Sequence, residues 1–261
     1  MKIALITGAS SGIGAEFARQ LAAKKLDLVL TARSQDKLDN LAEQLRQQHG
    51  IRTYIITQDL AEPGAASSVA RQVEEFGIVV DLLINNAGFG AYGSFSESHL
   101  ERQASMIQLN ISALVELTHA FLPAMLKRHE GRIINVSSIA GFQPMPYWSV
   151  YAASKAFVLS FSEALWAEVK EKGVKVLALC PGPTESNFFA VAEVPSNSEM
   201  SSNLNQLDSV KSVVTSALIA LESGQSNIVT GGLMTQLIAN LPRVLPRDVL
   251  VGLVEKQFRS A

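Results

Sequence analysis

The 261-residue sequence has one cysteine, four histidines and no excess of either charge. The single cysteine, Cys180, excludes an internal disulfide and any metal site that needs several cysteines. Because it lies in the apolar run VKVLALC, we expect a buried thiol rather than a nucleophile. The histidines are scattered without the spacing of metal ligands, so no metal site is expected from His49, His99, His119 and His129.

Strong charge bias and long apolar runs are both missing. The 22 Lys and Arg residues nearly balance the 24 Asp and Glu residues, and no basic segment indicates nucleic-acid binding. No stretch of about 18 uninterrupted apolar residues predicts a transmembrane helix. The glycines within residues 8–14 interrupt the apolar start of the chain, which argues against a signal peptide. With 48% hydrophobic residues, the composition predicts a globular, cytoplasmic protein.

Short apolar runs alternate with helical patterns along the whole chain. Helices are expected over residues 35–48, 64–76, 98–128 (with a break near Pro123), 149–172 and 210–222. Strands are expected over residues 3–6, 26–32, 52–57, 79–85, 132–137, 174–180 and 227–230. This alternation predicts an α/β fold: a Rossmann-type, doubly wound parallel sheet of about seven strands with helices on both faces, in a single domain over residues 1–261. Ligands of such sheets bind at the carboxyl ends of the strands.

A glycine turn, TGASSGIG, joins the first expected strand to a helical pattern. Gly8, Gly12 and Gly14 would let backbone amides approach a phosphate, and the helix dipole would favour the anion. The spacing differs from the dinucleotide fingerprint Gly-x-Gly-x-x-Gly, so the glycines alone are equally compatible with a tight turn. The strand-turn-helix context favours nucleotide binding.

Tyr151 and Lys155 are four residues apart in an expected helix, and therefore lie on one face of it. An ammonium group beside a phenol favours the phenolate and should lower the tyrosine pKa from about 10. Such a tyrosine serves as a general acid or base. Taken alone, however, a Tyr-x-x-x-Lys pair is more typical of a solvated helix face.

Seven short motifs occur together in one order and spacing. They are TGASSGIG (7–14), DL (59–60), NNAG (85–88), Asn110, NVSSIAG (135–141), YAASK (151–155) and PGPT (181–184). With these motifs the chain resembles the classical short-chain dehydrogenase/reductase family from Lys2 to about Phe189. The resemblance implies an oxidoreductase that uses a nicotinamide cofactor.

The resemblance also implies a catalytic tetrad of Asn110, Ser138, Tyr151 and Lys155. Tyr151 would donate a proton to the substrate carbonyl oxygen, and Ser138 would hydrogen-bond the same oxygen. Lys155 would hold the cofactor ribose and depress the pKa of Tyr151, and Asn110 would position a water that relays protons. Ser137 competes with Ser138 for its role, but spacing to Tyr151 favours Ser138, which leaves Ser137 as a strand-end hydroxyl bonding the backbone.

The residue after the second expected strand bears on cofactor choice. Ala32 stands where an NAD enzyme has a carboxylate for the ribose diol, and Arg33 follows it. A guanidinium pairs well with a 2′-phosphate, so we expect NADP(H) rather than NAD(H), although Arg33 also suits an exposed strand-end charge. The expected cofactor-binding residues are Gly8, Ser10, Ser11, Gly12, Ile13, Gly14, Arg33, Asp59, Leu60, Asn86, Ala87, Gly88, Tyr151, Lys155, Pro181, Gly182 and Thr184.

Two C-terminal segments depart from this regular pattern. Residues 185–208 are irregular and long for a loop, which indicates a substrate flap more than simple disorder. Residues 233–261 form a helical extension with an apolar stripe, broken by Pro242 and Pro246. The stripe would pack on its own domain, form a subunit interface in a homodimer or homotetramer, or make a weak contact with a membrane surface.

These features together predict an NADPH-dependent reductase of a ketone, aldehyde or 3-oxoacyl compound. Aromatic residues point to an apolar small-molecule substrate, because they gather in residues 89–92, in residues 142–148 with Met145, Tyr147 and Trp148, and at Phe188 and Phe189. The alternative is a regulatory protein that senses NADP(H) without turnover.

Overall fold

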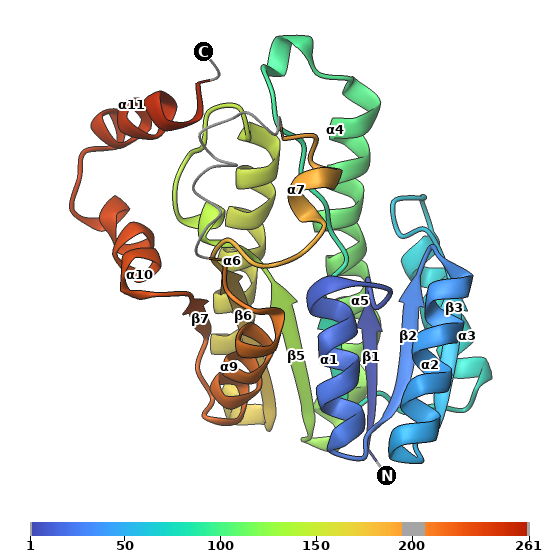
Figure 1. The fold of residues 1–261 in the computed structure, drawn as a ribbon. Helices are drawn as coiled ribbons and strands as arrows, with labels where there is room; N and C mark the ends of the chain where they lie inside the picture. The colour runs from blue at the N-terminus through green and yellow to red at the C-terminus, as the bar shows by residue number, and fades with distance from the viewer. Residues whose placement is uncertain (1, 195–206, 260–261) are drawn as a thin grey trace.

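The computed structural model describes residues 2–194 and 207–259. They form one seven-stranded sheet with the order β3-β2-β1-β4-β5-β6-β7, and every neighbouring pair is parallel (Figure 1). The strand order reverses between β1 and β4, which is the switch point of a doubly wound sheet. The predicted Rossmann-type fold is therefore confirmed. The strands are β1 Ile3–Thr7, β2 Asp27–Ala32, β3 Thr53–Thr57, β4 Leu82–Asn85, β5 Gly131–Val136, β6 Val174–Pro181 and β7 Asn227–Thr230.

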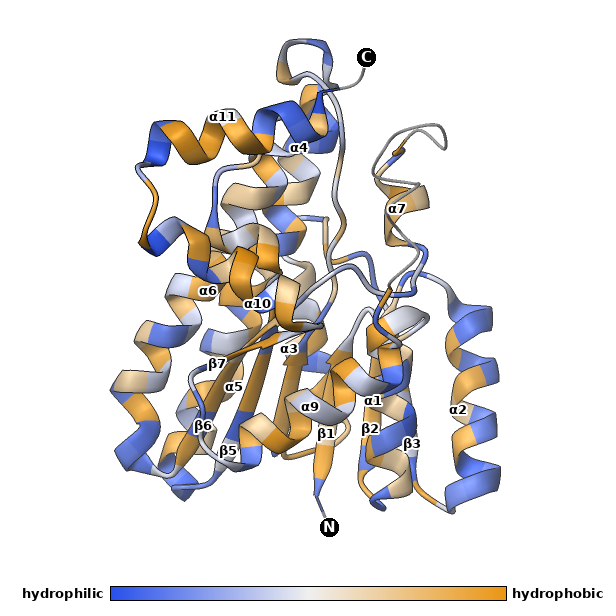
Figure 2. Cartoon of the chain, turned by 60° about the vertical axis from the view of Figure 1, so that its left-hand side comes forward, coloured by the Kyte–Doolittle hydropathy of each residue, from blue (hydrophilic) through white to orange (hydrophobic). Residues whose placement is uncertain are grey.

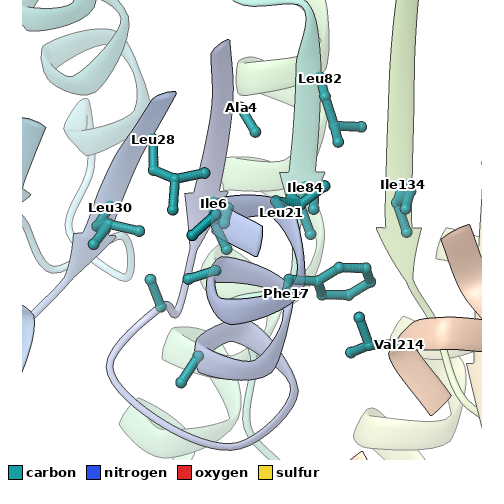
Figure 3. Close-up of a cluster of buried hydrophobic side chains, with 14 of the residues drawn as sticks. Ala4, Ile6, Phe17, Leu21, Leu28, Leu30, Leu82, Ile84, Ile134 and Val214 are labelled. Atoms are coloured by element: carbon teal, nitrogen blue, oxygen red, sulfur yellow. The ribbon is translucent and has the colours of Figure 1, made fainter. Parts of the chain in front are cut away.

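Helices cover both faces of the sheet. Helices α1 (Gly12–Ala23), α2 (Gln35–His49) and α9 (Val210–Glu222) pack on one face, and α3 (Ala65–Glu75), α5 (Ala113–Arg128) and α6 (Ser149–Val169) pack on the other. Alternate residues of each strand point to opposite faces, which accounts for two separate cores. Ile6 lies beside Phe17 of α1 and Val214 of α9 on the first face (Figure 3), and Leu5 belongs to the core of the second face.

The long helix expected over residues 98–128 is interrupted at a different place. Helix α4 (Leu100–Ile107) runs into a π turn, Gln108–Ser112, and then into α5. Pro123 lies inside α5 without ending it, so the break expected there is wrong. The helix tolerates this proline because Pro123 and His119, whose carbonyl loses its donor, are both exposed to water.

By length and composition, the run Leu100–Arg128 is apolar enough to cross a membrane, alone among the helices in the described ranges. This run is not an uninterrupted apolar stretch, since Glu116 and His119 interrupt it. In this fold its inner side packs against the sheet through buried Ala113, Leu117 and Met125, as a core helix does.

The C-terminal extension lies at one edge of the molecule (Figure 1) as α10 (Leu233–Asn240), a 3-10 turn (Leu241–Arg243) and α11 (Arg247–Phe258). The expected proline breaks are confirmed, with Pro242 in the turn and Pro246 at the start of α11. The two helices bury only Ala239, Leu250 and Val254. Packing on its own domain therefore accounts for a minor part of the apolar stripe, which leaves Leu233, Met234, Leu237, Leu241, Val244, Val249 and Leu253 exposed. Figure 2 shows hydrophobic segments along both α10 and α11.

Candidate active site

The glycine turn holds the end of β1 against the start of α1 with no room for side chains. Gly8 has a φ of +65°, a left-handed conformation that other residues rarely adopt. A Cβ atom on Gly14 would lie 2.3 Å from the carbonyl oxygen of Gly8 and 2.5 Å from Nδ2 of Asn86. Backbone of Gly8 and Gly14 and the side chain of Asn86 therefore meet at this point, and the close approach of the backbone suits a phosphate cradle.

Thr7 and Asn86 fasten the turn to the neighbouring strand β4. The Thr7 hydroxyl accepts hydrogen bonds from the backbone amides of Asn86 (3.0 Å) and Ala87 (2.9 Å). In return, Nδ2 of Asn86 donates to the carbonyls of Thr7 (2.9 Å) and Gly8 (3.3 Å). Sequence reasoning missed Thr7; its position at the strand end, just before the glycine turn, is the signal that would have identified it.

The amino end of α1 fits an anion. Ser11 precedes the helix in an extended conformation, and its side chain makes no capping hydrogen bond. The amides of the first turn, at Gly12, Ile13 and Gly14, therefore gain no side-chain cap, and the helix dipole gives this end a partial positive charge. Together with the close approach of Gly8 to Gly14, this donor set suits the pyrophosphate of a dinucleotide, and Ser10 lies partly buried beside it.

Arg33 and Asp59 lie together where β2 and β3 end. Nη1 of Arg33 is 3.7 Å from Oδ2 of Asp59, and the Arg33 side chain is 74% exposed. Asp59 accepts a hydrogen bond from the amide of Ala61, and the neighbouring Leu60 is buried. The guanidinium is thus available at the sheet edge, beside a carboxylate that orients it.

Tyr151 and Lys155 lie on α6 and are both buried, at 8% and 5% exposure. The interpretation of this pair as part of a solvated helix face is therefore wrong. Nζ of Lys155 donates a hydrogen bond to the carbonyl of Val136 (2.9 Å), at the end of β5. The hydroxyl of Ser137 donates to the carbonyl of Lys155 (2.7 Å), so Ser137 ties the helix to the strand, as its position predicted.

The pKa of Tyr151 is raised, whereas the sequence predicted that it would be lowered. Burial raises the pKa of Tyr151 to about 12, and hydrogen bonding to Ser138 only partly offsets it. Burial also lowers the pKa of Lys155 to about 8. Nζ of Lys155 lies 5.8 Å from the centre of the Tyr151 ring. Desolvation, which the sequence pattern does not reveal, is the largest cause of both pKa shifts.

Asn110 lies in the π turn between α4 and α5, a distortion often found at functional sites. Its Oδ1 accepts from the amide of Phe89 (3.1 Å), and its Nδ2 donates to the carbonyl of Phe89 and to the hydroxyl of Ser154 (both 3.0 Å). Gly88 packs against it, because a Cβ there would lie 2.9 Å from Oδ1 of Asn110 and 3.4 Å from Nζ of Lys155. The structure thus brings Asn110 and Lys155 together.

Ser138 follows β5 and begins a 3-10 turn, Ile139–Phe142. Its hydroxyl accepts a hydrogen bond from the amide of Ala140 (3.1 Å) and also hydrogen-bonds the phenol of Tyr151. The role of Ser138 as the catalytic serine stays a prediction. Ser138 and Tyr151 are the two hydroxyl groups that face each other at this edge.

A buried chain of side-chain hydrogen bonds crosses the sheet beneath these residues. Nδ2 of Asn85 donates to Thr118 on α5 (3.0 Å) and to Oδ1 of Asn135 (2.9 Å). Nδ2 of Asn135 donates to Ser162 on α6 (3.0 Å). These contacts fix α5 and α6 relative to β4 and β5, and so fix the positions of Asn110 and Tyr151.

The segment 181–184 continues from the end of β6 along the same edge. The amide of Gly182 donates a hydrogen bond to the carbonyl of Thr230 (3.1 Å). Thr184 is buried, and its hydroxyl donates to the carbonyl of Gly182 (2.8 Å). Thr184 also pairs with Asp208. Pro181 and Thr184 thus frame the start of the predicted flap, whose residues 195–206 lie outside the described ranges.

Aromatic side chains close the site above Tyr151. Trp148 stacks on Phe188 of α7 (Phe188–Val191), with ring centres 6.0 Å apart and an interplanar angle of 13°. The Phe188 ring also lies 5.2 Å from that of Tyr151. Tyr92 belongs to the same cluster, with its ring centre 5.6 Å from that of Trp148. These contacts assemble the apolar wall that the aromatic segments predicted.

Two members of the predicted wall lie elsewhere. Phe142 packs with Leu159 and Cys180 in a separate core. Burial raises the pKa of the Cys180 thiol to about 12, which makes a nucleophilic role unfavourable. Phe189 meets only Phe188 among the aromatic rings in the described ranges.

Comparisons with known proteins identify the family of the chain. A family model for the short chain dehydrogenase matches residues 2–195. The chain is 32% identical over 252 residues to dehydrogenase/reductase SDR family member 7B of Bos taurus, and the match covers 94% of this chain and 78% of that protein. It is 37% identical over 182 residues to the very-long-chain 3-oxoacyl-CoA reductase of Anas platyrhynchos, and that match covers 68% of this chain and 58% of the duck protein.

A solved structure is similar over the full length of the chain. The short-chain dehydrogenase from Sphingobium yanoikuyae in complex with NADPH superposes with a TM-score of 0.83 at 31% identity, and the match covers 100% of this chain and 97% of the other. Family model, relatives and fold agree. This chain therefore belongs to the short-chain dehydrogenase/reductase family and is an NAD(P)-dependent oxidoreductase.

Proposed function

We propose that the protein is an NADPH-dependent reductase of apolar carbonyl compounds, working reversibly as an alcohol dehydrogenase. The observation that carries this proposal is the meeting of Tyr151, Ser138 and Lys155 at the sheet edge beside the glycine turn. When bound, the nicotinamide cofactor supplies the hydride. The chain itself supplies a proton donor, a group that positions the substrate oxygen, and a buried cation.

The protonation states of these residues suit reduction. With a pKa of about 12, Tyr151 is a neutral phenol near pH 7, which is the form that gives a proton to a carbonyl oxygen. Ser138, hydrogen-bonded to that phenol, holds the same oxygen in place. Lys155 has a pKa of about 8 and is mostly charged near pH 7, so it stabilises the tyrosinate that forms. Asn110 fixes the loop around Phe89 through two hydrogen bonds, and it would position a water that relays protons.

The test is turnover itself. Purified protein with NADPH should consume the cofactor in the presence of ketones, aldehydes or 3-oxoacyl thioesters, measured as loss of NADPH absorbance. Apolar compounds should be favoured over small polar carbonyls, because the side chains that pack around Tyr151 are the apolar Phe89, Tyr92, Met145, Trp148 and Phe188. The duck relative is by name a reductase of very-long-chain 3-oxoacyl-CoA, an apolar carbonyl substrate. Turnover of small polar carbonyls only would contradict the apolar assignment.

NADPH is the preferred cofactor, because Arg33 follows β2 where Ala32 replaces the carboxylate of NAD enzymes. The Sphingobium relative was solved with NADPH. Arg33→Ala should weaken NADPH binding by about 10- to 100-fold, the worth of a charge-assisted hydrogen bond, and leave NADH binding unchanged. Arg71→Ala, which removes an exposed arginine on α3, is the matched control. Equal weakening of both cofactors by Arg33→Ala would contradict this preference.

The chain acts as one domain over residues 1–261, with residues 185–208 as its substrate flap.

The protein assembles in the cytoplasm as a homodimer or homotetramer. Assembly is supported by an exposed, uncharged face of α6 that carries Phe157, which is 41% exposed. Light scattering should report at least a dimer, and Phe157→Lys should shift it towards monomer. A monomeric wild-type protein would contradict the assembly. The other residues of this face are Ala153, Ala156, Ser160 and Ala164.

A further inference from the structure

The ring of Phe188 packs against Tyr151, the proposed proton donor. It faces the catalytic Tyr151 at 5.2 Å between ring centres and stacks on Trp148 at 6.0 Å. Tyr151 and Trp148 keep only 8% and 3% of their surface exposed. A carbonyl compound that reaches the phenol must therefore displace part of this cover, and Phe188 is the aromatic ring in contact with both residues.

Gly90 completes a flat slot around the Phe188 ring. A Cβ atom at Gly90 would lie 2.8 Å from Cζ of Phe188 and 2.9 Å from Cζ3 of Trp148. Gly90 does not have a left-handed φ, so its backbone would accept another residue. The missing side chain therefore provides space, and that space is filled by a ring that lies nearly parallel to Trp148.

Phe188 is held by a small element. Helix α7 has four residues, and Tyr92 and Arg102 bond its end through the carbonyls of Ala192 and Val191. Phe188 itself is only partly buried, unlike Trp148. A rotation of one side chain, or a shift of one short helix, empties the slot, whereas Trp148 and Tyr151 stay fixed at the start of α6.

We infer that Phe188 occupies the seat of a substrate ring, and that the preferred substrates are ketones with a flat aromatic ring next to the carbonyl. Such a ring displaces Phe188, stacks on Trp148, and brings its carbonyl oxygen to Tyr151 and Ser138. Flat rings are favoured over straight chains because offset stacking on Trp148 needs a π face. This inference rests on the proposed carbonyl reductase function.

Two ketones of similar size separate the classes: acetophenone, which has a ring, and 2-octanone, which has a straight chain. The wild-type protein should turn over acetophenone with a kcat/KM about tenfold higher. Gly90→Ala narrows the slot and should reverse or abolish this preference, whereas Gly252→Ala, with nothing within 4 Å of its new Cβ, should preserve it. A wild-type preference for 2-octanone would overturn the inference, and absence of turnover with every carbonyl compound would instead reject the proposed function.

Removing the internal occupant tests the seat directly. Phe188→Ala should lower the KM for acetophenone by about tenfold with little change in kcat, since substrate no longer competes with the Phe188 ring. Phe95→Ala, at a phenylalanine that is 64% exposed, is the matched control and should leave KM unchanged. A higher KM for acetophenone in Phe188→Ala would overturn the inference, because Phe188 would then be a wall of the pocket rather than its occupant.

A binding measurement without turnover gives a second readout. In a Trp166→Phe background, Trp148 is the remaining tryptophan and reports on the slot by fluorescence. Acetophenone added with NADP⁺ should change this fluorescence. In Gly90→Ala, about tenfold more acetophenone should be needed for half of the change. An unchanged response in Gly90→Ala would place the ring elsewhere and overturn the inference.

Discussion

Substitution by alanine should change the stability of the protein in opposite directions at two glycines that lie in helices. Gly14 lies in the first turn of α1, and a Cβ atom there would lie 2.3 Å from the carbonyl oxygen of Gly8 and 2.5 Å from Nδ2 of Asn86. Gly252 lies inside α11 with nothing within 4 Å of such an atom. Ordinary contact begins at 3.4 Å, so Gly14→Ala must separate α1 from the turn by roughly 1 Å.

The magnitudes follow from these distances. Gly14→Ala should lower the free energy of unfolding by about 1–3 kcal/mol, the usual cost of overpacking against rigid neighbours. Gly252→Ala should raise it by about 0.5–1 kcal/mol, because alanine replaces glycine in an open helix position. In a protein of this size, 1 kcal/mol shifts the melting temperature by roughly 2–4 °C. Gly14→Ala should also weaken NADPH binding at least about tenfold, since the phosphate-facing amides move.

Thermal unfolding by circular dichroism and titration with NADPH measure both effects on the same samples. Opposite shifts of the melting temperature, with weaker NADPH binding only in Gly14→Ala, would support the tight approach of α1 to the turn. If Gly14→Ala melted like the wild type and bound NADPH normally, the contact between Gly14, Gly8 and Asn86 would not be as close as described, and the phosphate cradle would lose its structural basis.

Three further substitutions probe the site and its support. Because the pKa of Lys155 is lowered to about 8, the unfolded chain holds a proton between about pH 8 and pH 10.5 that the folded chain has released. The free energy of unfolding of the wild type should therefore rise over this pH range by on the order of 3 kcal/mol relative to Lys155→Met. If denaturant unfolding gave the two proteins the same pH dependence, this prediction would be contradicted. Asn135→Ala should lower the free energy of unfolding by about 2–4 kcal/mol because it removes the buried hydrogen bonds with Asn85 and Ser162, and a loss below about 0.5 kcal/mol in urea unfolding would contradict it. Gly88→Ala should lower kcat/KM at least about tenfold by pushing on Asn110 and Lys155, and an unchanged steady-state rate would argue against that contact.

The fold could be predicted because its strands are short apolar runs that are buried on both faces. Leu28 and Val29, for example, face opposite cores, and such a continuous run requires helices on both sides. Turn glycines and the ends of strands then placed the polar motifs at one edge. Spacing along the chain favours Ser138 over Ser137 as the catalytic serine, and that choice stays a prediction; the Ser137 hydroxyl donates to the carbonyl of Lys155.

Features that depend on packing could not be predicted. The π turn around Asn110 has no signature in the residues 108–112, whereas Pro123, a strong local signal, leaves its helix intact. The Tyr151 pKa moves opposite to the prediction because its sign is set by burial, a property of the assembled site. Likewise, the stacking of Phe188 on Trp148 brings together residues 40 positions apart in the sequence, and no local sequence pattern predicts that contact.

The central claim, that Tyr151 is the proton donor of a carbonyl reductase, is tested most directly by Tyr151→Phe. NADPH consumption with acetophenone should be compared between this variant and the wild type, with NADPH affinity measured in parallel. We predict that kcat/KM falls by at least about 100-fold, the typical contribution of a general acid, while the affinity for NADPH changes less than about twofold. Undiminished turnover by Tyr151→Phe would contradict the account.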